Sequence, residues 1–533
     1  MFQNSEGVFL FGSLVLIACL LGSKLAGSRL GTPMLLLFLL IGMLCGEAGF
    51  IGIPFDNPDR ARSIGILALI VTLFSGGMDT KLSDIKPIYK QGISMATIGV
   101  FITAGLTGFV SYYIFKMMNH NSALSMAEAL LLAAVMSSTD SASVFSILQG
   151  KKVHLKNGLG KTLELESGSN DPMAYLLTIM IISFIQAGNL SAGAAILTFV
   201  LEIAVGGAIG FGLGWFSVKS INKWAKFSNE AFYPIAFLAG AIFIFAVSHE
   251  LHGNGYLAVY IAGLVIGNST VVHKRYTRRF FDGVTWLFQI VMFLTLGLLV
   301  NPGELWPLFG ISLVIGVFMI CIARPVAVFF SLLPFMKPFS KKGCIYLSWV
   351  GLKGAVPIIF AIYPITAGIE HAQIIFNVVF IITILSLFVQ GSTVVWTAQR
   401  MNLIEKAPRK DEFGVELPDE IKSAMSQIDI TAEILTHGNN LMTLKLPDHT
   451  LAVMVMRDKE FFIPKGETEL KENDKLLVIS DNDSALLQAY ETLGINDYTM
   501  TKNEDDAIGN GVSFPIRFRR KGAQHSEDTK NIN

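Results

Sequence analysis

Long apolar runs recur along the first 400 residues of the chain. Each is close to the roughly 17–25 residues that a helix needs to cross the hydrocarbon core of a bilayer. Polar residues gather in the short gaps between the runs. The pattern predicts an all-α polytopic membrane protein with a thirteen-span transmembrane domain over residues 1–400. The predicted spans lie near 8–23, 33–50, 63–78, 92–115, 127–148, 162–185, 191–217, 231–249, 256–269, 284–300, 305–333, 344–365 and 374–397.

Basic residues alternate between successive gaps. The odd-numbered gaps hold nineteen lysines and arginines, whereas the even-numbered gaps hold Arg60, Arg62 and Lys116. Because cytoplasmic loops carry the excess of basic residues, the odd gaps are predicted to be cytoplasmic. The N-terminus would then lie outside and the C-terminus inside. The basic residues of the odd gaps are Lys24, Arg29, Lys81, Lys86, Lys90, Lys151, Lys152, Lys156, Lys161, Lys219, Lys223, Lys226, Lys274, Arg275, Arg278, Arg279, Lys337, Lys341 and Lys342.

Composition agrees with a membrane protein and excludes several other classes. The chain is 52% hydrophobic and only 15% charged, and its mean hydropathy is +0.55. Soluble domains carry about 25% charged residues. The four cysteines are far apart and form no CxxC pair, which argues against a disulfide framework or a zinc site. We expect no metal site, no cofactor and no nucleic-acid partner.

Two of the predicted spans carry sequences that disfavour a continuous helix. In span five, Thr139 and Asp140 lie in a run of hydroxyl side chains that compete for backbone hydrogen bonds. In span twelve, the segment 351–357 combines two glycines with Pro357, which lacks a backbone donor. Transporters place ion sites at such breaks. Lys353 would lie where the two broken helices cross, with its charge offsetting their carbonyl ends.

Span six contains two acidic residues at membrane depth. A carboxylate at the centre of a span costs about 3 kcal/mol on insertion scales, so it is retained for a function. Glu166 and Asp171 are five residues apart and point in different directions, which indicates different roles. Asp171 would meet Thr139 and Asp140 if spans five and six pack side by side. An alternative is that Asp171 is only a structural buried acid.

Glu166 needs a permanent partner of opposite charge. The only arginine well inside a predicted span is Arg324, in span eleven. An ion pair between these two residues would satisfy both, because neither charge is stable alone in the bilayer. The alternatives for Asp140 are a cation ligand or a helix cap. The glycines of span seven are interpreted as helix-packing positions.

The segment Glu166–Asp171 followed by proline, with the Thr-Asp of span five and the GLKGAVP of span twelve, resembles the monovalent cation:proton antiporter-1 family. Within it, the chain is similar to potassium/proton antiporters related to cell volume regulation protein A. The resemblance implies a thirteen-span homodimer with inverted repeats and crossed, broken helices. It implies that Asp171 carries the proton and the cation in turn. The other implied site residues are Thr139, Asp140, Ser167 and Asn170 around the ion, and Glu166 with Arg324 as a structural pair.

The predicted function is therefore secondary antiport and not enzymatic catalysis. Burial disfavours the charged form of a carboxylate, so either a proton or a dehydrated cation would neutralise Asp171, but not both. The resemblance implies exchange of cytoplasmic K⁺ for external H⁺ in the inner membrane of a bacterial cell, electroneutral because Asn170 precedes the carrier. Na⁺/H⁺ exchange is the alternative. A cation channel gated by a cytoplasmic domain is a different class, and the chain has no TVGYG-like filter.

The last part of the chain is predicted to be a separate cytoplasmic domain. Residues 401–414 form a charged linker, and strand-like runs near 451–456, 460–463 and 475–479 precede a helix near 484–493. The segments 463–468 and 472–474 resemble those of the TrkA-C (RCK-C) regulatory domain, here over residues 415–498. Such domains pair as dimers and bind small regulatory ligands, which implies a nucleotide-type ligand. Residues 499–533 are predicted to be a disordered tail.

Overall fold

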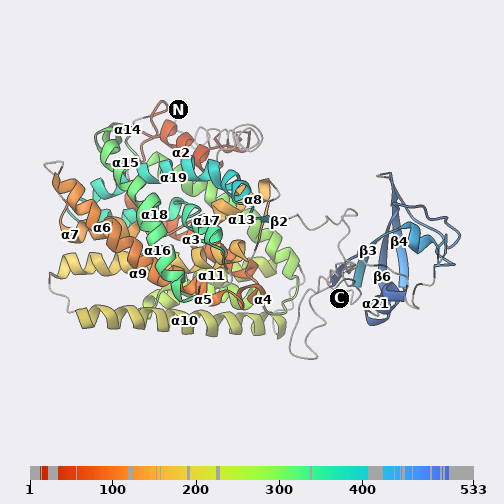
Figure 1. Ribbon diagram of the computed structural model, residues 1–533. Helices are drawn as coiled ribbons and strands as arrows, with labels where there is room; N and C mark the ends of the chain where they lie inside the picture. The colour runs from red at the N-terminus through yellow and green to blue at the C-terminus, as the bar shows by residue number, and fades with distance from the viewer. Residues whose placement is uncertain are drawn as a thin grey trace, which may run out of the picture. The chain divides into compact units, whose positions relative to one another are not determined.

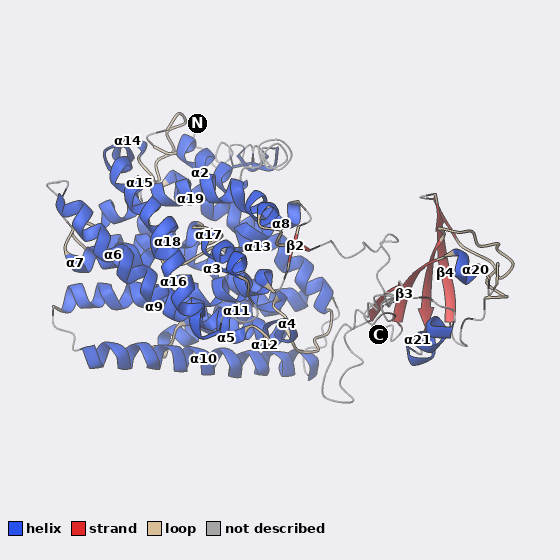
Figure 2. Cartoon of the chain, in the orientation of Figure 1, coloured by secondary structure: helices blue, strands red, loops and turns tan. Residues whose placement is uncertain are grey.

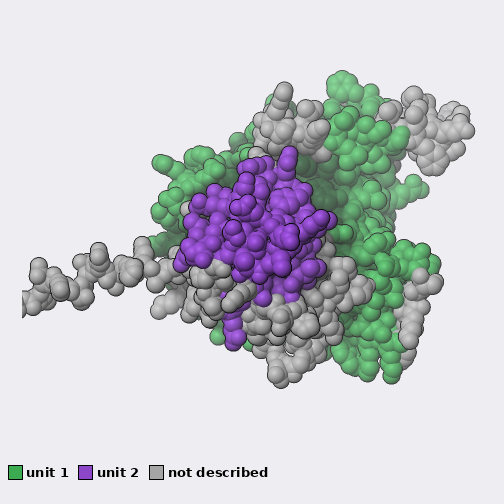
Figure 3. All heavy atoms as spheres, turned by 90° about the vertical axis from the view of Figure 1, so that its right-hand side faces the viewer, with its two compact units in different colours: residues 1–406 green, residues 407–533 purple. Residues whose placement is uncertain are grey.

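The computed structural model divides the chain into two compact units, residues 1–406 and 407–533 (Figures 1 and 3). Half of the predicted first span (8–23) and most of the predicted linker (401–414) and tail (499–533) lie outside the described residues. The boundary between the units falls within the predicted linker. The structure describes residues 12–13, 15–17, 19–21, 34–47, 49–55, 57–117, 124–151, 153–156, 158–188, 192–223, 229–335, 339–405, 424–436, 438–444, 446, 450–458, 460–480, 483–492, 495 and 498–502.

The first unit is a bundle of helices joined by short connections (Figure 1). A small sheet pairs β1 (His154–Leu155) with β2 (Ile404–Glu405) antiparallel. The π-helical turns η2 (Met95–Gly99) and η4 (Met319–Ala323) and the 3-10 turns η3 (Trp306–Leu308) and η5 (Leu333–Phe335) adjoin helices. The helices are α2 (Met34–Cys45), α3 (Pro58–Asp79), α4 (Leu82–Ile85), α5 (Tyr89–Ser94), α6 (Val100–Met117), α7 (Met126–Val135), α8 (Ser141–Gly150), α9 (Leu159–Ala187), α10 (Ala192–Lys223), α11 (Phe232–Glu250), α12 (Gly255–Gly267), α13 (Lys274–Leu298), α14 (Pro302–Leu305), α15 (Phe309–Phe318), α16 (Arg324–Leu332), α17 (Lys341–Trp349), α18 (Ala355–Thr366) and α19 (Ala372–Arg400).

The first unit is a mostly helical, multi-pass membrane domain. Within the described part of the chain, 7 helical stretches are long and apolar enough to cross a bilayer. Further apolar helices, among them α7, α12 and α18, are shorter. Each predicted span from the second to the thirteenth coincides with one helix or with a chain of adjoining helices. The count of thirteen and the orientation of the termini stay predictions.

The two predicted interruptions are present. Span five consists of α7 and α8, which are separated by residues 136–140, and span twelve consists of α17 and α18, which are separated by residues 350–354. Asp140 is at the start of α8, where its carboxylate accepts a hydrogen bond from the backbone N–H of Ser143, 3.1 Å away. The segment therefore breaks where side chains that compete with helical hydrogen bonds are concentrated.

Three of the glycines of span seven are confirmed as packing positions, whereas a Cβ at Gly212 would have no atom within 4 Å. Gly206, Gly210 and Gly214 recur every fourth residue on α10, so they lie on one face of the helix. A Cβ at Gly210 would lie 2.3 Å from the carbonyl oxygen of Ala258 on α12. The backbones of α10 and α12 approach so closely because these positions carry no side chain.

The second unit contains an antiparallel sheet with strand order β5-β4-β6-β3-β7 (Figure 2). Tyr498–Lys502 pairs with β3, so residues 499–502 belong to this sheet and the predicted tail boundary at 499 falls too early. The three predicted runs coincide with β4, β5 and β6. The elements are β3 (Ala424–Asp429), β4 (Thr450–Arg457), β5 (Glu460–Phe462), β6 (Lys475–Ser480), β7 (Tyr498–Lys502), α20 (Ala432–Leu435) and α21 (Asp483–Thr492).

A buried ion pair fixes the turn that precedes β6. Arg457 on β4 lies 2.6 Å from the carboxylate of Asp474, whose side chain is 1% exposed. Burial alone would raise the pKa of Asp474, but hydrogen bonds from Arg457 and the backbone of Lys471 hold this pKa below its usual value. The α+β architecture expected for this part of the chain is therefore present, whereas its cytoplasmic location and its assignment as a TrkA-C domain stay predictions.

We predict that Gly210→Ala lowers the melting temperature of the purified protein, whereas Gly212→Ala on the same helix does not. The new methyl group at 210 would meet the backbone of α12, and overpacking costs about 1–3 kcal/mol. A Cβ at Gly212 has no atom within 4 Å. Thermal unfolding in detergent checks this. Equal melting temperatures for the two variants would contradict the packing role of Gly210.

Candidate functional site

The two interrupted segments cross and contact each other through their backbones. The backbone N–H of Asp140 donates to the carbonyl oxygen of Leu352 at 2.8 Å. The ammonium group of Lys353 donates in the opposite direction, to the carbonyl oxygen of Ser138 at 2.8 Å. The approach requires glycine at 354, because a Cβ there would collide with the carboxylate of Asp140. The predicted crossing is therefore present.

Charged side chains lie at the helix ends that they stabilise. Asp140 lies at the N-terminal ends of α8 and α18, where unpaired N–H groups create a partial positive charge. Lys353 contacts the chain just after α7 and follows α17, where unpaired carbonyl groups create a partial negative charge. Lys353 is 2% exposed. Each end of the crossing thus receives a compensating charge.

Helix α9 places its polar residues against the unwound part of span five. Ser138 donates to the carboxylate of Asp171 at 2.5 Å. Ser167 donates to the carbonyl oxygen of Thr139 at 2.6 Å, and the Asn170 amide group donates to the Thr139 hydroxyl at 2.5 Å. These bonds place Asp171 beside the break.

The predicted ion pair between Glu166 and Arg324 is present. The guanidinium of Arg324 lies 2.5 Å from the Glu166 carboxylate, and the residues are 5% and 1% exposed. Arg324 and Pro325 begin α16 directly after the π-helical turn η4. The side chain of Arg324 passes over Gly351, where a Cβ would lie 2.7 Å from the Arg324 Nε atom. The pair therefore joins α9 and α16 next to the break of span twelve.

Side chains of α19 form hydrogen bonds with the backbone at the break of span twelve. The hydroxyl of Ser386 accepts a hydrogen bond from the backbone N–H of Lys353 at 2.9 Å and donates to Gln390 at 2.5 Å. Gln390 in turn donates to the carbonyl oxygen of Trp349 at 2.6 Å. Two polar side chains on one face of α19 thus pair with backbone groups at the break of span twelve.

All eight predicted site residues lie around this crossing, although their roles stay predictions. Sequence reasoning missed Ser138 as the hydroxyl that contacts Asp171, and it missed Ser386 and Gln390. The hydroxyl run of span five contained the signal for Ser138. A sequence gives no such signal for α19, because the register between distant helices is set by packing. The eight residues are Thr139, Asp140, Glu166, Ser167, Asn170, Asp171, Arg324 and Lys353.

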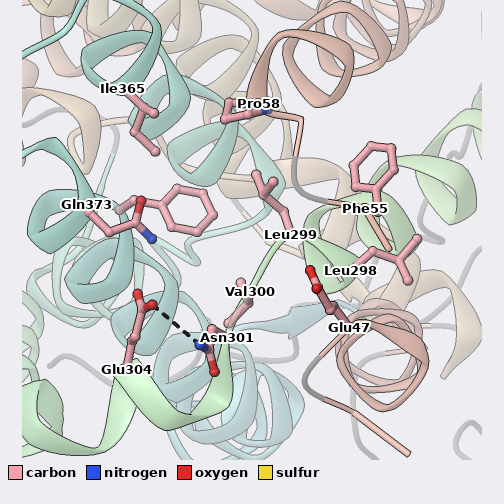
Figure 4. Close-up of a pocket in the computed structure, with 11 residues that line it drawn as sticks. Glu47, Phe55, Pro58, Leu298, Leu299, Val300, Asn301, Glu304, Ile365 and Gln373 are labelled. Carbon is pink, nitrogen blue, oxygen red and sulfur yellow. Dashed lines mark hydrogen bonds between the residues drawn. The ribbon is translucent and has the colours of Figure 1, made fainter. Parts of the chain in front are cut away.

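A separate cavity of about 490 Å³ contains none of these residues (Figure 4). It lies between the ends of α2, α3, α13, α18 and α19. Glu47 and Glu304 are among its lining side chains, and Glu304 accepts a hydrogen bond from Asn301. The lining residues are Glu47, Phe55, Pro58, Leu298, Leu299, Val300, Asn301, Glu304, Ile365, Gln373 and Phe376.

Comparison with known proteins identifies similar transporters. The family model for the transmembrane sodium/hydrogen exchanger matches residues 14–400. The chain is 38% identical over 489 residues to the K⁺/H⁺ antiporter NhaP2 of Shewanella oneidensis, covering 90% of this chain and 82% of that protein. It is 37% identical over 477 residues to the K⁺/H⁺ antiporter NhaP of Alkalimonas amylolytica, covering 89% and 80%.

A solved structure has a similar fold. The sodium proton antiporter MjNhaP1 from Methanocaldococcus jannaschii superposes with a TM-score of 0.63 at 24% sequence identity. The match covers 74% of this chain and 99% of that one. It supports the antiporter fold for the membrane unit.

We predict that Arg324→Ala destabilises the protein by about 3–5 kcal/mol, because it leaves a buried carboxylate without its partner. Adding Glu166→Gln to this variant removes the uncompensated charge and restores part of the loss. Melting temperatures of the wild type, both single variants and the double variant measure the coupling. An unchanged melting temperature for Arg324→Ala would show that the pair has no structural role.

Proposed function

Because the chain belongs to the sodium/hydrogen exchanger family, we propose that it is an antiporter that exchanges cytoplasmic K⁺ for external H⁺. Cation/proton exchange follows from the family and from relatives identical at 37–38%. The preference for K⁺ over Na⁺ rests on the names of those relatives. The observation that carries the mechanism is the buried carboxylate of Asp171 beside two interrupted helices.

The site offers oxygen atoms to a dehydrated monovalent cation. Asp171, the hydroxyls of Ser138 and Thr139, and the amide of Asn170 lie together. The Asn170 amide oxygen has no hydrogen-bond partner among the described residues. Carbonyl, hydroxyl and carboxylate oxygens can replace the hydration shell of an alkali cation. In this proposal the cation displaces the proton from Asp171, because both compete for one carboxylate.

The balance of charges supports exchange of one cation for one proton. Asp140, Glu166 and Asp171 carry three negative charges when ionised, and Arg324 and Lys353 carry two positive charges. The ionised site thus has one net negative charge. One proton or one monovalent cation neutralises it, so both loaded forms have the same charge. A site that crosses the bilayer only when neutral would exchange the two ions electroneutrally.

The orientation, the role of the second unit and the oligomeric state are also part of the proposal. The distribution of basic residues favours a cytoplasmic C-terminus, and the proposal assigns thirteen spans to the inner membrane of a bacterial cell. The second unit would act there as a TrkA-C regulatory domain that binds a small nucleotide-type ligand, and the protein would form a homodimer. These assignments rest on the resemblance described above. Na⁺/H⁺ exchange is retained as the alternative because MjNhaP1, of similar fold, is named a sodium proton antiporter.

We predict that Asp171→Asn abolishes cation-dependent proton flux while the protein remains folded. An amide cannot bind and release a proton at this position. A pH-sensitive dye in everted membrane vesicles reports the flux after K⁺ is added and, separately, Na⁺. We expect K⁺ to cause dequenching in the wild type and neither ion to do so in the variant.

Glu370→Gln is the control, because this exposed carboxylate lies in the turn between α18 and α19. It should retain wild-type flux. Flux retained in Asp171→Asn would exclude this residue as the carrier. Dequenching by Na⁺ alone would contradict the preference for K⁺ and leave the antiport mechanism in place.

A further inference from the structure

One face of α9 changes from partly exposed to buried at the proposed carrier residue. Residues three or four apart lie on the same face of a helix. Along this face, the residues before Asp171 are partly exposed, whereas Asp171 and the residues after it are buried. The face is formed by Lys161, Glu164, Gly168, Asp171, Tyr175 and Thr178.

An aromatic cluster covers the buried half of this face. The ring centroid of Tyr175 lies 4.9 Å from that of Tyr256 on α12 and 5.5 Å from that of Tyr363 on α18. The hydroxyls of Tyr256 and Tyr363 are hydrogen-bonded to each other at 3.1 Å. The fully buried ring of Phe360 lies 5.9 Å from Tyr175. Three helices therefore meet one turn beyond Asp171.

Arg62 connects α3 to α18 next to this aromatic cluster. Arg62 near the start of α3 donates to the hydroxyl of Thr366 at 2.9 Å, and its guanidinium lies 5.7 Å from the Tyr363 ring centroid. Pro58 and Ile365, which line the cavity of Figure 4, are each within about one helical turn of these residues. Arg62 and Tyr363 thus connect segments that line the cavity with Tyr175, which lies one turn from Asp171.

The turns of α9 before Asp171 make partly exposed and partly polar contacts. Tyr260, one turn further along α12, packs on Gly168, where a Cβ would lie 2.5 Å from the ring. The next contact is polar: Thr80 donates to Glu164 at 2.9 Å, and the Glu164 side chain is 19% exposed. Tyr256 and Tyr260 therefore contact α9 on the two sides of Asp171.

We propose that Tyr175, Tyr256 and Tyr363, together with Arg62, form the seal that separates Asp171 from the external side in this state. The inference rests on the proposed antiport function and orientation. Exchange requires that Asp171 be reached from each side in turn. The contacts of Tyr256 and Arg62 with α18 must then break when the site opens outward. These residues position the helices and do not themselves bind the cation.

If the tyrosines form this seal, weakening it should change the apparent cation KM differently on the two faces of the membrane. Removing the Tyr256 hydroxyl keeps the ring but deletes a bond that, in this proposal, is made only while the external side is closed. The net contribution of one hydrogen bond corresponds to a change of about fivefold in a two-state equilibrium. An apparent affinity scales with the fraction of molecules in the competent state. The ratio of the apparent cation KM on the cytoplasmic face to that on the external face should therefore rise about fivefold.

The test compares Tyr256→Phe and Tyr363→Phe in everted and right-side-out vesicles, which present opposite faces to the added cation. Tyr346→Phe is the matched control, because this buried tyrosine of α17 bonds to the carbonyl oxygen of Val394 at 3.4 Å, outside the cluster. We expect the KM ratio to rise in both test variants and to stay at the wild-type value in the control, with little change in kcat.

Two results would overturn the seal. One is an unchanged KM ratio in variants that still exchange ions, and the other is an equal rise in Tyr346→Phe. If a phenylalanine variant fails to accumulate, Arg62→Gln provides the same test, because it breaks the contact between α3 and α18. A wild type without any exchange would instead contradict the proposed function itself, which separates the two failures.

Discussion

The crossing of two interrupted helices is the constraint on which the membrane unit depends. Unwinding a helix inside a bilayer leaves N–H and C=O groups that lipid cannot satisfy. Here the two breaks satisfy each other, through the bond from Asp140 to Leu352 and the bond from Lys353 to Ser138. Both charges are thereby held at helix ends of opposite partial charge. The arrangement fixes the unwound segment of span five, and that segment fixes Asp171 on α9 through Ser138 and Thr139.

Much of this site could be predicted from the sequence because polar residues in an apolar span have few alternatives. The breaks followed from the local chemistry of Thr139-Asp140 and of the glycines around Lys353. The pairing of Glu166 with Arg324 followed from elimination, since Arg324 was the only arginine well inside a predicted span. The contacts of α19 could not be predicted, because they depend on how a distant helix packs. The tail boundary was misplaced because the sheet gains β7 by long-range pairing with β3.

The aromatic cluster bears on which side of the membrane can reach Asp171. A carboxylate that binds a proton or a cation in turn has to be accessible from one side at a time. On α9 the change from exposed to buried occurs at Asp171, and α12 places Tyr256 and Tyr260 on its two sides. Small residues on α3, α10 and α12 bring these backbones close together, so that the helix bearing Tyr256 and Tyr260 lies directly against the helix bearing the proposed carrier. The proposed site and the proposed seal are thus built from the same few helices.

In the proposed mechanism the ionised site carries one net negative charge, which one proton or one cation neutralises. Reversal of exchange in proteoliposomes tests this most directly, with the membrane potential clamped and the cation and proton gradients varied independently. Electroneutral one-for-one exchange requires that net flux cease when the K⁺ and H⁺ concentration ratios are equal, at every potential. A reversal point that shifts with membrane potential would show that net charge crosses the membrane in each cycle and would contradict it.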